Sequence, residues 1–263
     1  MQLNFYQIDS FTDVLFKGNP ACVVPLKSWL PDAVLLKIAQ ENAVAETAFF
    51  VTGGEKVHLR WFTPEVEMDL CGHATLAAAH VLKEMLNVGG DRICFTTLSG
   101  DLGVSVKGGI YWLDFPSRVP VPASLPSAIS EALNILPTAV LKSRDYVLVY
   151  DSEEDIMNIR VNRQLLDRIN LDPGGVIVTA EGKTCDFVSR YFTPQASIFE
   201  DPVTGSAHCS LIPYWTGKLG KKEMKARQLS QRTGELLCVD KGDRVLIGGR
   251  AVTYSAGTLY IGL

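Results

Sequence analysis

A pentapeptide that recurs half a chain apart constrains the fold of this sequence more than any other feature. Residues 60–64 read Arg-Trp-Phe-Thr-Pro and residues 190–194 read Arg-Tyr-Phe-Thr-Pro, a separation of 130 in a chain of 263 residues. Carried on without gaps, the same offset pairs Cys71 with Asp201. Helix-like and strand-like segments precede the two copies in the same order. Self-similarity at a fixed period marks a repeated structural unit, so we expect a duplicated fold with two related halves.

Each half is expected to place a helix after its pentapeptide. In the first half this helix spans about 72–86 and is apolar on nearly every side, which is typical of a helix enclosed by other elements. In the second half it begins near Gly205 and contains Pro213, where we expect a kink or a stop because proline has no N–H to donate. The short alternating strands around these helices predict an α+β fold of two mixed sheets, each wrapped on one buried helix.

A proline-rich segment separates the two halves. Four prolines fall within residues 116–126, and this density suits a stiff, extended connection. We therefore expect an N-terminal half over residues 1–117 and a C-terminal half over residues 118–251.

Composition narrows the class of protein further. Apolar residues make up 47% of the chain and charged residues 21%, as in ordinary globular proteins, and the formal net charge is −4. That balance favours neither nucleic acid nor a membrane as a partner, and no apolar run is long enough for a spanning helix. The first ten residues do not read as a signal peptide. Six dispersed cysteines indicate reduced thiols in a cytoplasmic protein, and four dispersed histidines indicate no metal site.

Two of the motifs place a glycine at the start of a helix. Residues 69–75 read Asp-Leu-Cys-Gly-His-Ala-Thr, and residues 200–207 read Glu-Asp-Pro-Val-Thr-Gly-Ser-Ala. Backbone N–H groups and the positive end of the helix dipole attract anions at such a point, so a pair of these helix starts predicts a cradle for a substrate carboxylate. Ordinary helix capping by Thr204 or Ser206 is the alternative interpretation of the local sequence.

These segments resemble the motifs of the phenazine biosynthesis PhzF-like family, which shares the diaminopimelate epimerase-like fold. The matching segments run through essentially the whole chain and are Phe16–Pro20, Glu46–Phe49, Arg60–Pro64, Cys71–Thr75 and Asp201–Ser206. The resemblance implies two pseudo-symmetric halves, each a barrel-like mixed β-sheet around a central helix, with the active site in the cleft between them. It also implies that the last strand, at about 252–263, crosses back to the N-terminal half, and that the protein is a homodimer.

The resemblance implies a role for each of the residues that match the family motifs. Glu46 is the expected proton-transferring carboxylate, and its apolar neighbours suit that role because burial disfavours the charged form of an acid. His73, at a helix start, is expected to stay neutral and to bond the substrate. Asp201 would orient an amino or hydroxyl group of the substrate, and Ser206 would bond its carboxylate. The expected substrate-binding residues are Asn19, Gly72, Thr75 and Gly205.

The function that follows is a cofactor-independent isomerase that moves a proton between carbons of a small carboxylated metabolite. No glycine-rich phosphate loop, nicotinamide fingerprint or pyridoxal lysine motif is visible, so no cofactor is expected. One alternative is an amino-acid epimerase or racemase that uses Cys71 with a second base. The pairing of Cys71 with Asp201 counts against two symmetric thiols and favours a packing role for Cys71. The other alternative is a catalytically silent metabolite-binding protein, although a pure binder gains little from an acid among apolar residues.

Overall fold

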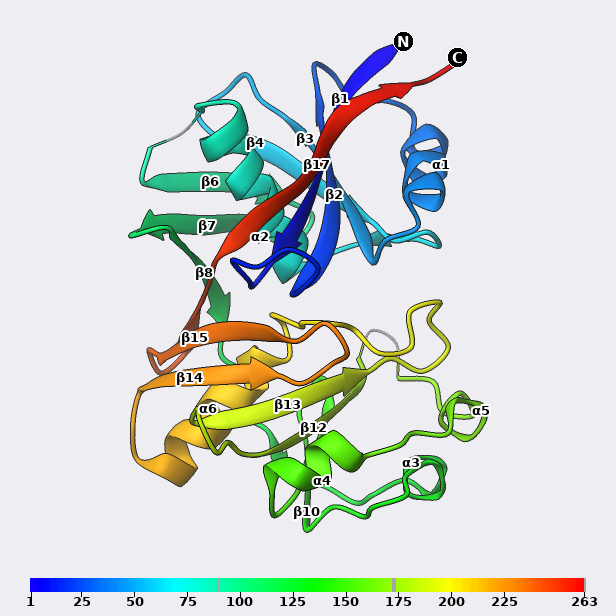
Figure 1. Cartoon of the computed structure of the whole chain (residues 1–263), viewed down its shortest axis with the longest axis vertical. Coiled ribbons are helices and arrows are strands. Elements are labelled where there is room, and N and C mark those ends of the chain that lie inside the picture. The colour runs from blue at the N-terminus through cyan, green and yellow to red at the C-terminus, as the bar shows by residue number, and fades with distance from the viewer. Residues whose placement is uncertain (89, 172–173, 263) are drawn as a thin grey trace. The chain divides into compact units, whose positions relative to one another are not determined.

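The computed structural model describes residues 1–88, 90–171 and 174–262 and divides the chain into two compact units (Figure 1). The first unit comprises Met1–Asp114 and Gly248–Leu263, and the second comprises Phe115–Ile247. Leu263, the last residue of the strand that was expected to cross back, lies outside the described residues. Among the described residues, no helix combines the length and apolar character needed to cross a membrane.

The first unit is one mixed sheet with strands in the order β17–β1–β2–β3–β4–β6–β7–β8. Neighbouring strands are antiparallel, except that β2 runs parallel to β3 and β4 runs parallel to β6. The strands are β1 (Gln2–Ser10), β2 (Asn19–Leu26), β3 (Glu46–Val51), β4 (Val57–Phe62), β5 (Glu67–Met68, paired with β4), β6 (Arg92–Thr97), β7 (Gly100–Lys107), β8 (Ile110–Pro116) and β17 (Ala251–Tyr260). The helices are α1 (Asp32–Asn42) and α2 (Gly72–His80), and α2 continues into a π-helical turn, η1 (Val81–Met85).

The strand β3 lies between the two helices of the first unit. Phe49 packs against Leu35 and Ile38 of α1. Glu46, an odd number of residues away and therefore on the opposite face of the strand, lies 3.0 Å from His73 of α2. Because both faces are covered, the four central residues of β3 are all buried, whereas β7 and β8 alternate between buried and more exposed positions.

The central helix matches the expectation from the sequence. All nine residues of α2 are buried, and with η1 the helix continues as far as Met85, so the predicted helix over 72–86 is confirmed. The one large polar side chain at its C-terminal end, His80, is bonded on both ring nitrogens. Nδ1 lies 3.1 Å from the Tyr111 hydroxyl and Nε2 lies 2.9 Å from the Thr253 hydroxyl. Burial lowers the pKa of His80, which keeps this helix end uncharged.

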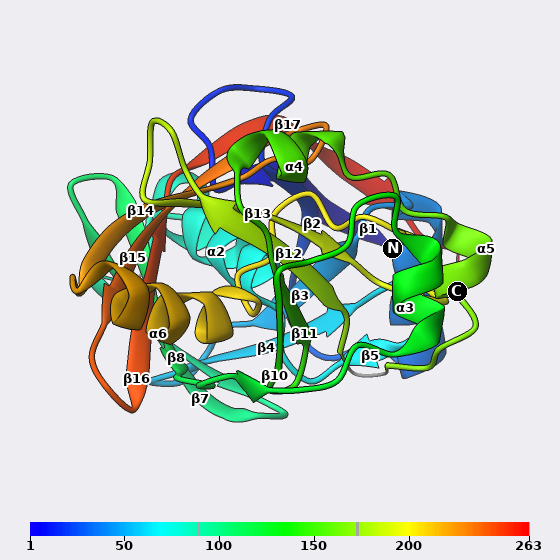
Figure 2. The same cartoon turned by 90° about the horizontal axis from the view of Figure 1, so that it is seen from below.

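The second unit is a mixed sheet with strands in the order β9–β10–β11–β12–β13–β14–β15. Here β11 is parallel to β12 and β13 is parallel to β14, and the other neighbours are antiparallel. The strands are β9 (Val121–Pro122), β10 (Ala139–Lys142), β11 (Tyr146–Val149), β12 (Val176–Glu181), β13 (Phe187–Phe192), β14 (Glu223–Gln228), β15 (Gly234–Asp240) and β16 (Arg244–Gly249). The helices are α3 (Ser127–Ala132), α4 (Glu153–Asn158), α5 (Arg163–Leu166) and α6 (His208–Leu219), and α6 lies beside β15 (Figure 2).

The helix α6 differs from its expected form in two respects. It begins at His208 rather than near Gly205, because residues 205–207 form a turn. It also continues through Pro213, where the sequence suggested a kink or a stop. Proline leaves the carbonyl four residues earlier, that of Cys209, without its helical donor. The backbone N–H of Arg118 donates to the Cys209 carbonyl at 2.9 Å. This acceptor therefore keeps a hydrogen bond, and the helix continues past Pro213.

The two units repeat one strand plan, which confirms the predicted duplication. The pairings from β1 to β7 are antiparallel, parallel, antiparallel, parallel and antiparallel in turn. The pairings from β10 to β15 follow the same series. The repeated pentapeptides occupy matching positions, since Phe62 pairs with Thr47 and Phe192 pairs with Val176.

The gapless offset between the halves is wrong beyond the pentapeptide. After β4 the chain folds back so that Phe62 pairs with Glu67, whereas after β13 it folds back so that Phe192 bridges to Glu200. The loop of the second half is therefore three residues longer, and the offset rises from 130 to 133. The ion pairs agree with this register. Arg60 donates through Nε and Nη2 to Glu67 at 2.6 Å each, and Arg190 does the same to Glu200 at 2.7 and 3.0 Å.

The corrected offset changes which residues of the two halves correspond. Cys71 is equivalent to Thr204 and not to Asp201, and Gly72 is equivalent to Gly205. A gapless alignment of the two halves does not reveal such a short insertion, because the motifs on either side of it still look alike. The earlier conclusion that the halves do not carry a symmetric pair of thiols is unchanged, because threonine has no thiol.

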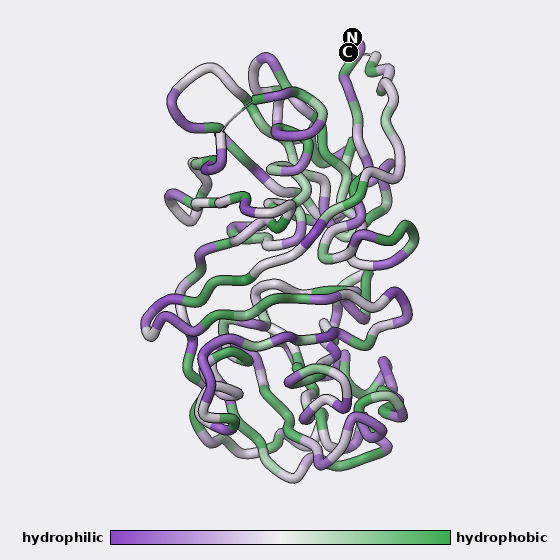
Figure 3. The backbone as a smooth tube through the Cα atoms, turned by 60° about the vertical axis from the view of Figure 1, so that its left-hand side comes forward, coloured by the Kyte–Doolittle hydropathy of each residue, from purple (hydrophilic) through white to green (hydrophobic). Residues whose placement is uncertain are grey.

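Both ends of the described chain belong to the first unit. The strand β17 pairs with β1 over its whole length, from Gln2 opposite Tyr260 to Ser10 opposite Ala251. The backbone N–H of Ile261 also donates to the carbonyl of Met1 at 2.9 Å, and the two ends lie side by side in Figures 1 and 3.

Candidate active site

The first unit places a glutamate against a histidine in a nearly closed environment. Glu46 is the first residue of β3, and its side chain is 16% exposed. Its Oε2 lies 3.0 Å from Nε2 of His73, whose side chain is 4% exposed. The two residues meet because β3 turns its even-numbered face toward the first turn of α2.

Three other residues hold the His73 ring and backbone in place. On the far side of the ring, Nδ1 lies 3.1 Å from Nδ2 of Asn19 and 3.6 Å from Sγ of Cys71. The hydroxyl of Ser10 donates to the His73 carbonyl at 2.9 Å. Ser10 ends β1 and Asn19 begins β2, so the loop that joins these strands has a contact to His73 at each end.

The groups around His73 set the pKa of its imidazole. Burial by itself would lower the pKa of His73, but the Cys71 sulfur and the Glu46 carboxylate outweigh it and raise that pKa well above its usual value. Burial, reinforced by Glu46, raises the pKa of the Cys71 thiol to about 11. Of the two groups that raise the pKa of His73, Glu46 is the one beside Nε2, at 3.0 Å. The expectation that His73 stays neutral at a helix start is contradicted by the raised pKa, because Cys71 and Glu46 together outweigh burial.

This assignment makes a testable prediction about His73. We expect its imidazole to be protonated at pH 7 in the wild type and its pKa to be lower in Glu46→Gln, because one of the two groups that raise this pKa is then removed. Side-chain ¹⁵N chemical shifts of the histidines report both states. His208 provides a control in the same spectrum, since burial lowers its pKa to about 4 and it should be neutral in both proteins. Equal pKa values for His73 in the two proteins, titrated by these shifts, would contradict the role given to Glu46.

The two other expected residues of the first unit lie at the start of the helix. Gly72 is the first residue of α2 and is buried directly before His73. Thr75 is fully buried, and its hydroxyl donates to the carbonyl of Cys71 within the first helical turn. Glu46, His73, Asn19 and Gly72 therefore meet in one place, while the Thr75 hydroxyl is already engaged by the helix.

A metal is less consistent with this cluster than proton transfer is. Within the described part of the chain, Glu46, Cys71 and His73 bring three metal-ligand atoms within 4.8 Å of one another. However, Glu46 contacts Nε2 of the ring and Cys71 contacts Nδ1, so the two do not converge on one nitrogen.

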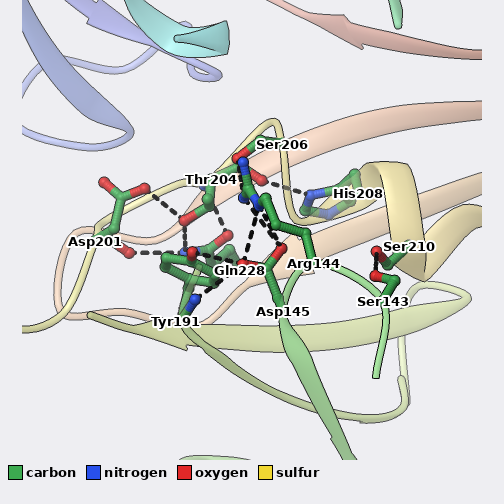
Figure 4. Close-up of polar contacts among 11 residues, drawn as sticks. Ser143, Arg144, Asp145, Tyr191, Asp201, Thr204, Ser206, His208, Ser210 and Gln228 are labelled. Carbon is green, nitrogen blue, oxygen red and sulfur yellow. Dashed lines mark hydrogen bonds and ion pairs between the residues drawn. The ribbon is translucent and has the colours of Figure 1, made fainter. Parts of the chain in front are cut away.

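The expected residues of the second unit lie in a separate polar cluster (Figure 4). The Thr204 hydroxyl donates to the Asp201 carboxylate, and the Thr204 backbone N–H donates to Oε1 of Gln228 at 2.9 Å. In return Nε2 of Gln228 donates to the Asp201 carbonyl at 2.7 Å and to the Thr204 hydroxyl at 3.1 Å. Gln228 is 1% exposed, so one buried amide fixes the segment that leads to Gly205 and Ser206.

Ser206 is held by a charged pair that the sequence reasoning missed. Nη2 of Arg144 donates to the Ser206 hydroxyl at 3.0 Å and to Asp145 Oδ2 at 3.0 Å. Asp145 is fully buried and also accepts from the Gly175 N–H at 2.9 Å and the Tyr191 hydroxyl at 3.0 Å. The available signal was the adjacent Arg-Asp pair just before an apolar strand, because such charges are seldom placed there without partners. No comparable signal in the sequence pointed to Gln228.

The buried His208 makes the stability of the fold depend on pH. It is equivalent to Thr75 by the corrected offset, and Nδ1 lies 2.9 Å from the Thr204 carbonyl just as the Thr75 hydroxyl bonds that of Cys71. Because burial lowers the pKa of His208 to about 4, the native state favours the neutral ring.

We therefore expect His208 to stabilise the fold above the unfolded-state pKa and to lose that contribution as the pH falls from about 6.5 to about 4. The unfolded chain binds the proton over this range and the native chain does not. The loss is on the order of 3 kcal/mol in the free energy of unfolding. Urea denaturation of the wild type and of His208→Asn, which keeps a donor near the Thr204 carbonyl, measures it as a difference in pH slope. Parallel slopes would contradict the prediction.

Comparison with known proteins supports both the fold and the class of protein. A family model described as phenazine biosynthesis-like protein matches residues 8–257. An uncharacterized isomerase of Pseudomonas aeruginosa is 46% identical over 261 residues, which is 99% of this chain and 100% of that protein. The crystal structure of a phenazine biosynthesis protein of the PhzF family from Enterococcus faecalis superposes with a TM-score of 0.95 at 45% identity, covering 99% of this chain and 100% of that one.

A more distant structure shows how widely the fold is shared. A hydroxyproline epimerase from Agrobacterium vitis superposes with a TM-score of 0.64 over 98% of this chain and 92% of its own. Its sequence identity is 10%, so the likeness is one of fold alone. Together these structures confirm the predicted α+β, epimerase-like fold class.

Proposed function

Because the chain belongs to the phenazine biosynthesis-like (PhzF) family, we propose that it is an isomerase that moves a proton between carbons of a small carboxylated metabolite, with Glu46 carrying the proton. The observation that supports this most directly is the Glu46–His73 pair, in which a carboxylate lies 3.0 Å from a buried imidazole. A general acid or base needs a partner within hydrogen-bond reach that can share its proton, and the buried imidazole of His73 is placed to do so.

The difference between the halves supports a single acid rather than two. By the pairing of β3 with β4 and of β12 with β13, the position equivalent to Glu46 is Gly175. A Cβ atom at Gly175 would lie 2.7 Å from the Tyr191 ring, so that position has no room for a side chain. The place that holds the acid in the first unit is filled by an aromatic ring in the second.

On this proposal one carboxylate acts twice in each turnover. Glu46 takes a proton from one carbon, the electron pair of the broken C–H bond moves into the adjacent π-system, and the same proton returns at another carbon. The substrate contacts expected of Asp201, to an amino or hydroxyl group, and of Ser206, to the carboxylate, are kept as part of this proposal. The expected cytoplasmic location and homodimer stay predictions.

The chemistry of Cys71 counts against the epimerase alternative. A two-base epimerase needs a thiolate or a second base opposite the first, whereas the Cys71 thiol has a pKa of about 11 and its counterpart is Thr204. Cys71 is 5% exposed, directly precedes α2 and lies with its sulfur 3.6 Å from Nδ1 of His73, which is consistent with a packing role.

Isotope tracing in heavy water separates the two mechanisms. The test screens small unsaturated and amino carboxylates by ¹H NMR and then analyses the product of the one that turns over. A single shuttle returns part of the substrate's own hydrogen to the product, whereas two bases on opposite faces deliver a solvent deuteron every time. Products that all carry deuterium would overturn the proposal, and so would the absence of turnover across the whole panel.

A further inference from the structure

The inference concerns Arg144, whose guanidinium lies between a buried acid and the expected substrate-binding Ser206 (Figure 4). Nε of Arg144 donates to Asp145 Oδ1 at 3.2 Å, and Nη2 donates to Asp145 Oδ2 and to the Ser206 hydroxyl at 3.0 Å each. The Arg144 side chain is 21% exposed and that of Asp145 is 0% exposed. One side of the guanidinium is thus fixed by Asp145 while its tip reaches Ser206.

Asp145 is held firmly enough to act as an anchor for Arg144. Besides Arg144, it accepts hydrogen bonds from the Gly175 backbone N–H and the Tyr191 hydroxyl. Three donors from three segments of the chain therefore converge on this one carboxylate. A fixed carboxylate restricts the planar guanidinium, so the direction of the bond to Ser206 is set in advance.

The first unit shows the same arrangement with different chemistry. There Nδ2 of Asn19 lies 3.1 Å from Nδ1 of His73, and His73 follows Gly72 as Ser206 follows Gly205. In each half, the side chain after the glycine faces a polar group at or just before the start of a strand, β2 in the first half and the equivalent β11 in the second. In the first half that group is a neutral amide, whereas in the second it is a permanent cation.

We propose that Arg144 is a positioning residue that makes Ser206 a hydrogen-bond donor toward an anionic group of the substrate. Because the Ser206 oxygen accepts from Arg144, its own hydrogen is directed elsewhere, toward an acceptor. The nearby guanidinium charge favours a carboxylate over a neutral amide of the same shape. This inference rests on the proposed function, since it names how the carboxylate of that substrate is recognised.

The test compares two probes that differ in charge and hardly in shape, benzoate and benzamide. Each is titrated into ¹⁵N-labelled protein, and binding is followed at the backbone amides of Gly205 and Ser206. We expect benzoate to shift both amides in a saturable way and to bind at least about tenfold more tightly than benzamide, the scale of one charge-assisted hydrogen bond. Equal binding of the two probes, or no saturable shift with benzoate, would overturn the proposal.

The variants separate positioning from a merely structural effect. Arg144→Gln combined with Asp145→Asn removes both charges, so that neither group is left unpaired, and it should bring the benzoate-to-benzamide ratio to about one. Arg144→Lys keeps the charge and should restore part of that ratio. Arg163→Gln is the control, because Arg163 bonds Asp167 and the Ala196 carbonyl elsewhere in the same unit. A structural defect would weaken both probes together and leave the ratio unchanged.

Combination with Ser206→Ala tests whether Arg144 acts through the hydroxyl. If it does, adding Ser206→Ala to the Arg144→Gln/Asp145→Asn protein lowers benzoate affinity little further. Independent, fully additive losses would contradict the relay. The test measures binding and not turnover, so it is equally informative in Glu46→Gln protein. A failure of Glu46 as the acid and a failure of Arg144 as the positioning residue are therefore distinguishable.

Discussion

Replacing Glu46 with Gln should slow proton transfer by about 10²–10⁴-fold, the usual contribution of a positioned general acid or base. Glutamine keeps the shape of the side chain but cannot accept or return a proton. The quantity to measure is the turnover number for the substrate that the NMR screen identifies. Thermal unfolding, measured in parallel, shows whether the variant is folded. Glu46→Asp retains the acid but moves it away from His73. Its turnover number should fall between those of the wild type and of Glu46→Gln.

Cys71→Ser is the matched control for this prediction. Cys71 lies 3.6 Å from the other nitrogen of the same imidazole, so its replacement perturbs the same cluster without removing the proposed acid. Turnover close to that of the wild type is expected. If Cys71→Ser is as inactive as Glu46→Gln, the thiol takes part in catalysis and the assignment of Glu46 as sole shuttle is wrong.

Replacing Asp145 with Ala should lower the free energy of unfolding by about 3–5 kcal/mol, the cost of breaking a buried ion pair by removing one partner. The change leaves Arg144 without its counter-charge and also removes the acceptor of the Gly175 N–H and the Tyr191 hydroxyl. Urea denaturation followed by circular dichroism measures the loss.

Asp101→Ala provides the comparison on the surface of the first unit. Asp101 forms an ion pair with Lys56, and both side chains are about half exposed, so solvent screens the interaction. Its removal should leave the denaturation midpoint close to that of the wild type. An Asp145→Ala protein as stable as Asp101→Ala would mean that the buried carboxylate is not an anchor.

The sequence predicted the repeated architecture because hydrophobic patterning and motif spacing survive duplication. The buried helix after Gly72 and the equivalence of Phe62 with Phe192 were both readable from residue types alone. The three-residue insertion was not, because only the strand bridges to Glu67 and Glu200 reveal it. Contacts that form only when the chain folds leave no trace in the local sequence.

The same limit explains the errors at individual residues. The continuation of α6 through Pro213 depends on the N–H of Arg118, which lies far away in the sequence. The raised pKa of His73 depends on Cys71 and on Glu46, which lies on a different element. In both cases a local rule about proline or about helix ends was outweighed by a partner that only the folded chain brings near.

The pairing of β1 with β17 has a consequence for how the protein is made. The second unit, Phe115–Ile247, is continuous in sequence and is synthesised in full before β17. The first unit must wait, since β1 has one neighbour in β2 but its other edge is free until residues 251–260 emerge. An open strand edge readily pairs with other chains. The nascent protein should therefore be most prone to aggregation in the interval before β17 appears. The segment that carries Glu46 and His73 has already been translated by then, so the first unit holds its candidate catalytic residues before its sheet is complete.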